Sequence, residues 1–99
     1  MPRASNVGGK RRYAAVVAAG MRKVATEPAG PATRERVELS RGIRSFHLRN
    51  ARAGKAEAQV RRPAHVLYYR AVRPGLVEIV RVLHERMEPS RHIDADPEE

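Results

Sequence analysis

Two apolar segments joined by a short turn constrain the fold of this chain more than any other feature. Residues His65–Val72 and Leu76–His84 are rich in β-branched and aromatic side chains, which are typical of strands. Arg73, Pro74 and Gly75 separate the two segments and have the length and composition of a hairpin turn. The pattern therefore predicts an antiparallel β-hairpin.

Both faces of this predicted hairpin carry apolar side chains. Strict alternation divides the second strand into two sets, Val77, Ile79, Arg81 and Leu83 against Leu76, Glu78, Val80, Val82 and His84. It divides the first strand into Val66, Tyr68, Arg70 and Val72 against His65, Leu67, Tyr69 and Ala71. A sheet with one face in water should alternate apolar and polar residues cleanly. We therefore expect both faces to be covered, one by the helix and the second by missing chain, a second subunit or another protein.

One amphipathic helix is expected before the sheet, over Lys10–Thr26. Its apolar stripe, with Gly20 included, follows helical spacing and consists of Tyr13, Val16, Val17, Gly20, Met21 and Val24. Pro28 and the residues after it end the helix. Gly20 costs about 1 kcal/mol relative to alanine in a helix, and close approach of another backbone is a reason to keep it. Residues 1–9 show no periodicity and are expected to be a loose entry segment.

The other segments complete an α+β reading of the chain. Ile43–Leu48 predicts a further strand, after a polar connection over 27–42. The basic segment 49–62 is compatible with strand or loop. We expect an antiparallel sheet of three or four strands packed on one main N-terminal helix. The expected organisation is a flexible segment 1–9, a folded domain 10–93 and an acidic, disordered tail 94–99.

Size and composition limit the core. The chain has 99 residues, of which 41% are hydrophobic, but much of that share is alanine and there is no tryptophan. The aromatic residues are Tyr13, Phe46, Tyr68 and Tyr69. One modest core fits this inventory, and a two-domain enzyme is excluded. Such a chain should be marginally stable alone and should gain stability from a partner.

Charge is the strongest compositional signal. The formal net charge is +9, and only three of the 20 basic residues are lysines. Residues 1–62 hold 15 basic and 4 acidic residues, whereas 63–99 hold 5 basic and 7 acidic residues. Arginine's planar fork suits carboxylates and phosphates, so the balance indicates an acidic protein or a nucleic acid as partner. A GC-rich genome, which favours arginine and alanine together, explains part of the excess.

Several classes of site are disfavoured. The chain has no cysteine, which excludes disulfides, thiolate metal sites and a cysteine nucleophile and fits a reducing compartment. The longest apolar run, Tyr13–Met21, is too short to cross a membrane. His84, Glu85, His92 and Asp94 are potential metal ligands, but no two histidines have a familiar ligand spacing. We expect a cytoplasmic protein without metal or cofactor.

Three segments carry a resemblance to a known family. GIRSFHLRNAR (42–52), RRPAHVLYYRAV (61–72) and GLVEIVRVLHERMEPSRHI (75–93) resemble the C-terminal part of ParE-type toxins of the ParE/RelE superfamily, also called plasmid stabilisation proteins. The helix over 10–26 resembles the second helix of that family. The family usually opens with an edge strand and a first helix, and residues 1–9 offer no counterpart. The resemblance therefore implies an N-terminally shortened form of the ParE/RelE fold.

The resemblance also implies a function. ParE-type toxins belong to type II toxin-antitoxin systems, inhibit growth by binding DNA gyrase and are neutralised by a cognate antitoxin. On this reading the chain is not an enzyme, and a homodimer or a heterotetramer with the antitoxin is possible. RelE relatives instead cleave messenger RNA on the ribosome, which makes an endoribonuclease the alternative. A basic nucleic-acid-binding protein or an inactive remnant is the third reading.

Candidate site residues follow from these readings. The predicted partner-binding residues are Arg44, Tyr68, Tyr69, Arg70, Arg81, His84 and Arg86. For RNA cleavage, His84 would act as acid or base and Arg70 and Arg81 would hold the phosphate. Tyr68 or Tyr69 would stack on a base. The competing structural reading pairs the two arginines with Glu78 or Glu85, packs His84, and puts at least one tyrosine in the core.

Overall fold

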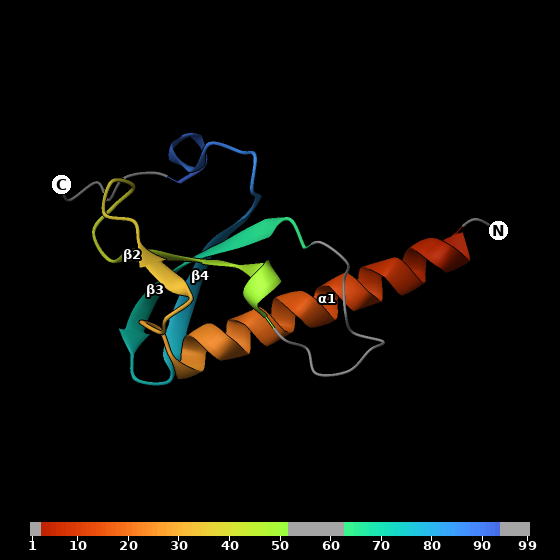
Figure 1. Cartoon of the computed structure of the whole chain (residues 1–99), viewed down its shortest axis with the longest axis horizontal. Coiled ribbons are helices and arrows are strands. Elements are labelled where there is room, and N and C mark those ends of the chain that lie inside the picture. The colour runs from red at the N-terminus through yellow and green to blue at the C-terminus, as the bar shows by residue number, and fades with distance from the viewer. Residues whose placement is uncertain (1–2, 52–62, 94–99) are drawn as a thin grey trace.

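One helix and a four-stranded antiparallel sheet make up the fold (Figure 1). The computed structural model describes residues 3–51 and 63–93, with side chains from Tyr13 onward. The elements are α1 (Arg3–Thr26), β1 (Thr33–Glu35), β2 (Ile43–His47), β3 (His65–Arg73) and β4 (Leu76–His84), with short 3-10 turns at Leu48–Asn50 and Pro89–Arg91. The expected α+β class is confirmed, and the sheet has four strands in the order β1-β2-β3-β4. The predicted tail 94–99 and most of the segment 49–62 lie outside the described residues.

The helix is longer than its sequence pattern predicts. It begins at Arg3 rather than Lys10, so residues 3–9, expected to be a loose entry segment, are helical. The apolar stripe that guided the prediction starts only at Tyr13, where α1 meets the sheet. The end at Thr26 is as predicted: the Thr26 hydroxyl donates to the Arg22 carbonyl oxygen over 2.9 Å, and Pro28 follows.

Strand β1 lies inside the stretch that the sequence assigned to a polar connection. Its three residues are polar and show no apolar alternation, so the pattern gave no strand signal. Pairing creates the strand: Thr33 lies opposite Phe46, and Glu35 lies opposite Arg44. The guanidinium of Arg44 donates to the Thr33 hydroxyl over 2.8 Å and lies 3.6 Å from the Glu35 carboxylate. These contacts hold β1 on the sheet.

The β3–β4 hairpin forms where it was predicted, but one face assignment changes. Gly75 adopts φ +80° at the turn, a conformation that glycine tolerates best. The register shifts between Tyr68 and Tyr69, which pair with Arg81 and Ile79, so β4 has one extra residue there. This β-bulge reverses the alternation. Leu83 therefore lies on the face opposite Val77 and Ile79, contrary to the expectation of strict alternation.

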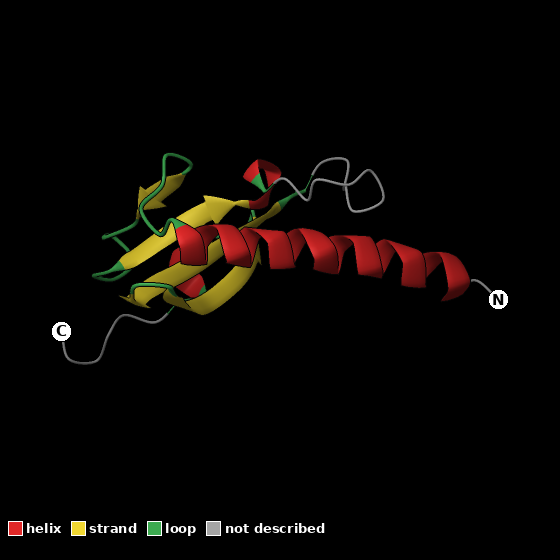
Figure 2. Cartoon of the chain, turned by 90° about the horizontal axis from the view of Figure 1, so that it is seen from below, coloured by secondary structure: helices red, strands yellow, loops and turns green. Residues whose placement is uncertain are grey.

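Helix α1 crosses one face of the sheet, as Figure 2 shows, and the main core lies between the two. Its buried members are Val16, Val24, Phe46, Leu48, Leu67 and Tyr69. A Cβ on Gly20 would lie 2.6 Å from Leu48 Cδ2 and 3.2 Å from Leu67 Cδ1. Gly20 is thus a point of close approach, as expected, although side chains rather than a second backbone approach it.

A second, smaller core covers part of the other sheet face. Leu39 from the loop before β2 and Ile93 from the end of the described chain pack with Ile43, Tyr68 and Leu83. The chain's own loops therefore cover part of this face. The sequence pattern did not indicate that they would. The remainder of the face is hollowed into a pocket.

Candidate ligand-binding site

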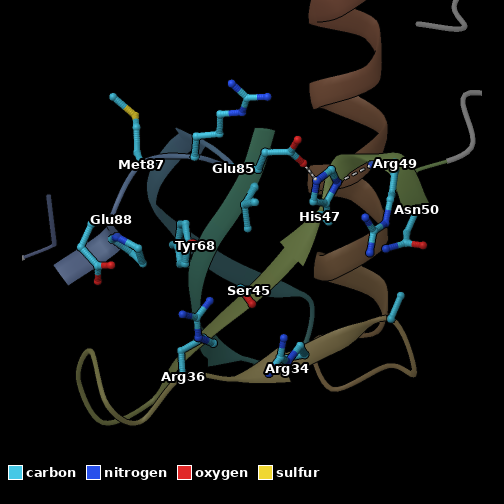
Figure 3. A pocket seen from close by; sticks show the side chains of 14 residues that line it. Arg34, Arg36, Ser45, His47, Arg49, Asn50, Tyr68, Glu85, Met87 and Glu88 are labelled. Carbon is cyan, nitrogen blue, oxygen red and sulfur yellow. Dashed lines mark hydrogen bonds and ion pairs between the residues drawn. The ribbon is translucent and has the colours of Figure 1, made fainter. Parts of the chain in front are cut away.

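A pocket of about 470 Å³ opens on the sheet face away from α1 (Figure 3). Its floor comes from β2 and β3, and its walls come from β1, the turn after β2 and the segment after β4. We call it the arginine pocket, after the four arginines among its lining residues. These are Ala32, Arg34, Arg36, Ser45, His47, Arg49, Asn50, Val66, Tyr68, Glu85, Arg86, Met87, Glu88 and Pro89.

His47 and Glu85 form a hydrogen-bonded pair on one wall of the pocket. The ring nitrogen Nδ1 of His47 accepts from the backbone N–H of Arg49 over 3.1 Å, so in the neutral ring the proton lies on Nε2. That nitrogen donates to the Glu85 carboxylate over 2.6 Å, and this bond lowers the pKa of Glu85 from its usual value near 4.5. Both ring nitrogens of His47 are therefore occupied.

Arg36 and Tyr68 form the opposite part of the pocket. The Arg36 guanidinium lies 5.6 Å from the centre of the Tyr68 ring, within cation–π range. It also donates to the Glu38 carboxylate over 2.7 Å, and that bond lowers the pKa of Glu38. Tyr68 is only 5% exposed. Arg36 is thus already engaged with the protein, and the Tyr68 ring lies beneath it.

Of the predicted partner-binding residues, the pocket brings together Tyr68 and Arg86. Arg44 instead fastens β1 to β2. Tyr69 is fully buried against α1, and its hydroxyl donates to the Pro28 carbonyl oxygen. The expected partner-binding role of Tyr69 is corrected to a core role, because a side chain on the α1 face of a central strand has no open surface.

Arg70, Arg81 and His84 do not converge. Arg70 lies 3.7 Å from Glu78 across the hairpin, which confirms the structural pairing suggested for it. His84 pairs with His65, five residues from Arg70 along β3, so their backbones are about 17 Å apart at the usual rise of a strand. Arg81 and His84 point to opposite faces, since they are three positions apart in a regularly paired part of β4. The three side chains do not share a site.

Sequence reasoning missed most of the arginine pocket. Arg34, Arg49 and His47 lie in separate segments of the chain, and no spacing links them to Glu85 or Arg86. The basic excess before Pro63 gave no guide to the pocket, because it is heaviest in residues 1–26, which hold six basic and no acidic residues. Only the sheet register shows that the segments lining the pocket meet the end of β4.

Three rings form a chain at the edge of the α1 face. The Tyr13 hydroxyl forms a hydrogen bond with Nδ1 of His65, and the two rings meet edge to face with centres 5.1 Å apart. The ring centre of His65 lies 5.3 Å from that of His84. Burial, and secondarily the charge of His84, lowers the pKa of His65 from its usual value of 6.5. Burial also raises the pKa of Tyr13.

We predict that His65 lowers the free energy of unfolding as the pH falls. Because the folded state lowers the pKa of His65, its contribution is complete above pH 6.5 and is lost as the pH falls through the lowered value. Urea unfolding measured from pH 7.5 downward should therefore show a falling free energy of unfolding below about pH 6.5. His65→Gln should flatten this slope, whereas His92→Gln in the C-terminal turn should keep it. An unchanged slope in His65→Gln would contradict the assignment.

The described residues offer little for other kinds of site. Within 3–51 and 63–93, no three histidine or carboxylate side chains are placed to hold a metal ion. In the same part of the chain, no helix is both long and apolar enough to cross a bilayer. The candidate site therefore consists of arginines, one histidine–glutamate pair and a buried tyrosine.

The fold and the pocket define a small basic α+β domain that presents arginines on the open face of an antiparallel sheet. A family model described as the ParE toxin of the type II toxin-antitoxin system, parDE, matches residues 2–89. The chain therefore belongs to the ParE toxin family and is the toxin component of a type II toxin-antitoxin system, which implies an antitoxin partner. No curated protein and no solved structure gave a match.

Proposed function

We propose that this toxin inhibits growth in the cytoplasm by binding DNA gyrase, and that a cognate antitoxin neutralises it. The observation that carries the proposal is the separation of the candidate catalytic side chains on the sheet. An inhibitor that acts by binding needs a complementary surface, whereas an RNA-cleaving enzyme needs its acid, base and phosphate ligands around one phosphodiester.

The sheet register argues against the endoribonuclease alternative. His84 lies on the α1 face, where its Nδ1 accepts from the Arg86 backbone N–H over 3.1 Å and its ring packs on His65. Arg81 lies on the opposite face, and Arg70 lies toward the other end of the hairpin, beside Glu78. Side chains on opposite faces and at opposite ends of the sheet cannot act on the same scissile bond.

The arginine pocket does not supply a substitute catalytic set. His47 is the histidine among its lining residues, and both of its ring nitrogens are hydrogen-bonded within the protein. A general base must reach the 2′-hydroxyl of the substrate. His47 would first have to give up Glu85, so the pocket as built favours binding over proton transfer.

Regulated expression in bacteria tests the proposal. Induction should arrest growth and relax a reporter plasmid, because gyrase supplies negative supercoils, while messenger RNA stays intact. His84→Ala and Arg81→Ala should each keep the growth arrest. Loss of arrest in both variants at normal protein levels, together with new messenger RNA ends, would instead support the endoribonuclease.

A further inference from the structure

We propose that the arginine pocket is the docking site for an acidic peptide segment of the antitoxin. This inference rests on the proposed function for the identity of the partner, but its chemistry follows from the pocket alone. The ligand class is a peptide that offers several carboxylates.

Three of the four pocket arginines are available to an incoming anion. Arg34 on β1, Arg49 after β2 and Arg86 after β4 are exposed, and none of them takes part in an ion pair in the part of the chain that the structure describes. They approach the pocket from three different segments. A guanidinium binds a carboxylate through two parallel hydrogen bonds, so the three heads can hold carboxylates at separate points.

The two acidic residues of the pocket are already engaged. Glu85 accepts from His47 over 2.6 Å. Glu88 accepts from the Ser90 hydroxyl over 2.9 Å. Arg36 is paired with Glu38, whereas Arg34, Arg49 and Arg86 form no ion pair among the described residues and outnumber the two carboxylates of the pocket. The pocket therefore presents excess positive charge on a chain whose net charge is already +9, which favours an acidic ligand.

A peptide fits these residues better than a nucleic acid does. Recognition of single-stranded RNA relies on exposed rings that stack on bases. Of the two rings that line the pocket, Tyr68 is 5% exposed beneath Arg36, and His47 is fixed by two hydrogen bonds. Met87, 44% exposed at the rim, offers an apolar contact to a side chain of a peptide.

Fluorescence anisotropy with defined probes tests the inference on the full-length chain. The probes are a labelled peptide of alternating glutamate and leucine, its glutamine analogue, and a single-stranded RNA of the same net charge as the acidic peptide. We expect the acidic peptide to bind, and the glutamine peptide and the RNA to bind at least about tenfold more weakly.

Charge-matched double variants separate the pocket from general electrostatics. Arg34→Gln/Arg86→Gln should weaken binding of the acidic peptide by about tenfold or more. Arg22→Gln/Arg73→Gln removes the same charge from exposed positions on α1 and the hairpin and should change the affinity little. Matching thermal unfolding curves establish that each variant is folded.

The peptide and RNA measurements distinguish the proposed docking site from its alternatives. Equal losses in the two double variants, or no binding of the acidic peptide, would overturn the pocket as its site. Tighter binding of the RNA that depends on Arg34 and Arg86 would assign the pocket to a nucleic acid. None of these readouts uses gyrase, so a failed gyrase assay with intact peptide binding would overturn the proposed target and leave the docking site in place.

Discussion

Replacing Phe46 with alanine should lower the free energy of unfolding by about 3–5 kcal/mol, the usual cost of removing a buried phenylalanine. Phe46 is 1% exposed and packs with Val16, Leu67 and Tyr69 in the main core. Domains of this size have about 5–15 kcal/mol of stability in total. Its neighbours are themselves buried and held in the packed core, so they can fill the resulting cavity only in part. Much of the variant should therefore be unfolded under mild conditions.

Urea denaturation followed by circular dichroism measures this effect. Val37→Ala is the control, because Val37 is 67% exposed and its truncation should change stability by less than about 0.5 kcal/mol. Phe46→Leu should fall between the parent and the alanine variant, since it keeps part of the buried volume. Similar midpoints for Phe46→Ala and Val37→Ala would contradict the position of the core.

Gly20→Val should destabilise the chain by about 1–3 kcal/mol, although valine is the better helix former by about 0.5 kcal/mol. The reason is the space at Gly20: a new Cβ would lie 2.6 Å from Leu48 Cδ2 and 3.2 Å from Leu67 Cδ1. Leu48 and Leu67 are both fully buried, so neither has room to retreat. The branched γ-carbons of valine would add further overlap.

A compensating change isolates this contact. Leu48→Ala alone should lower the free energy of unfolding by about 2–5 kcal/mol. The double variant Gly20→Val/Leu48→Ala should lose less than the sum of the two single losses, because valine would occupy the vacated space. Ala14→Val, at an exposed position of α1, controls for helix propensity. Strict additivity of the two changes, measured by urea unfolding, would show that residues 20 and 48 do not meet.

Local patterns explain which parts of the fold could be predicted. The β3–β4 hairpin, β2 and the end of α1 each have a signal within a few residues: apolar strands around a proline–glycine turn, or proline after a stripe. The start of α1 at Arg3 has no such signal, because the stripe begins only where the helix meets the sheet at Tyr13. The three residues of β1 likewise show no strand pattern, and the strand depends on pairing with β2.

The candidate site was harder to predict than the fold for a related reason. Alternation places Tyr68 and Tyr69 on opposite faces, which the structure confirms, but it does not indicate which face is open. The bulge in β4 then moves Leu83 to the second face, and Leu39 and Ile93 cover part of that face from distant segments. Only the hollow that remains brings Arg34, Arg49 and Arg86 together.

The charge distribution also acquires a structural meaning. Arg34, Arg36 and Arg49 come from the strongly basic part of the chain before Pro63, and Glu85, Arg86 and Glu88 come from the near-neutral part after it. The sheet places both groups around one pocket. The net charge alone indicates any acidic partner. The pocket gives part of that charge a defined place on the surface, where we propose that carboxylates of a protein bind.

Inhibition of purified DNA gyrase is the most direct test of the central proposal. The full chain, added to gyrase and relaxed plasmid with ATP, should block supercoiling in proportion to its concentration, and His84→Ala should block it equally well. Messenger RNA on translating ribosomes should remain uncut by the same preparation. Unimpaired supercoiling at an excess of folded protein, together with cleavage of ribosome-bound messenger RNA, would contradict the account.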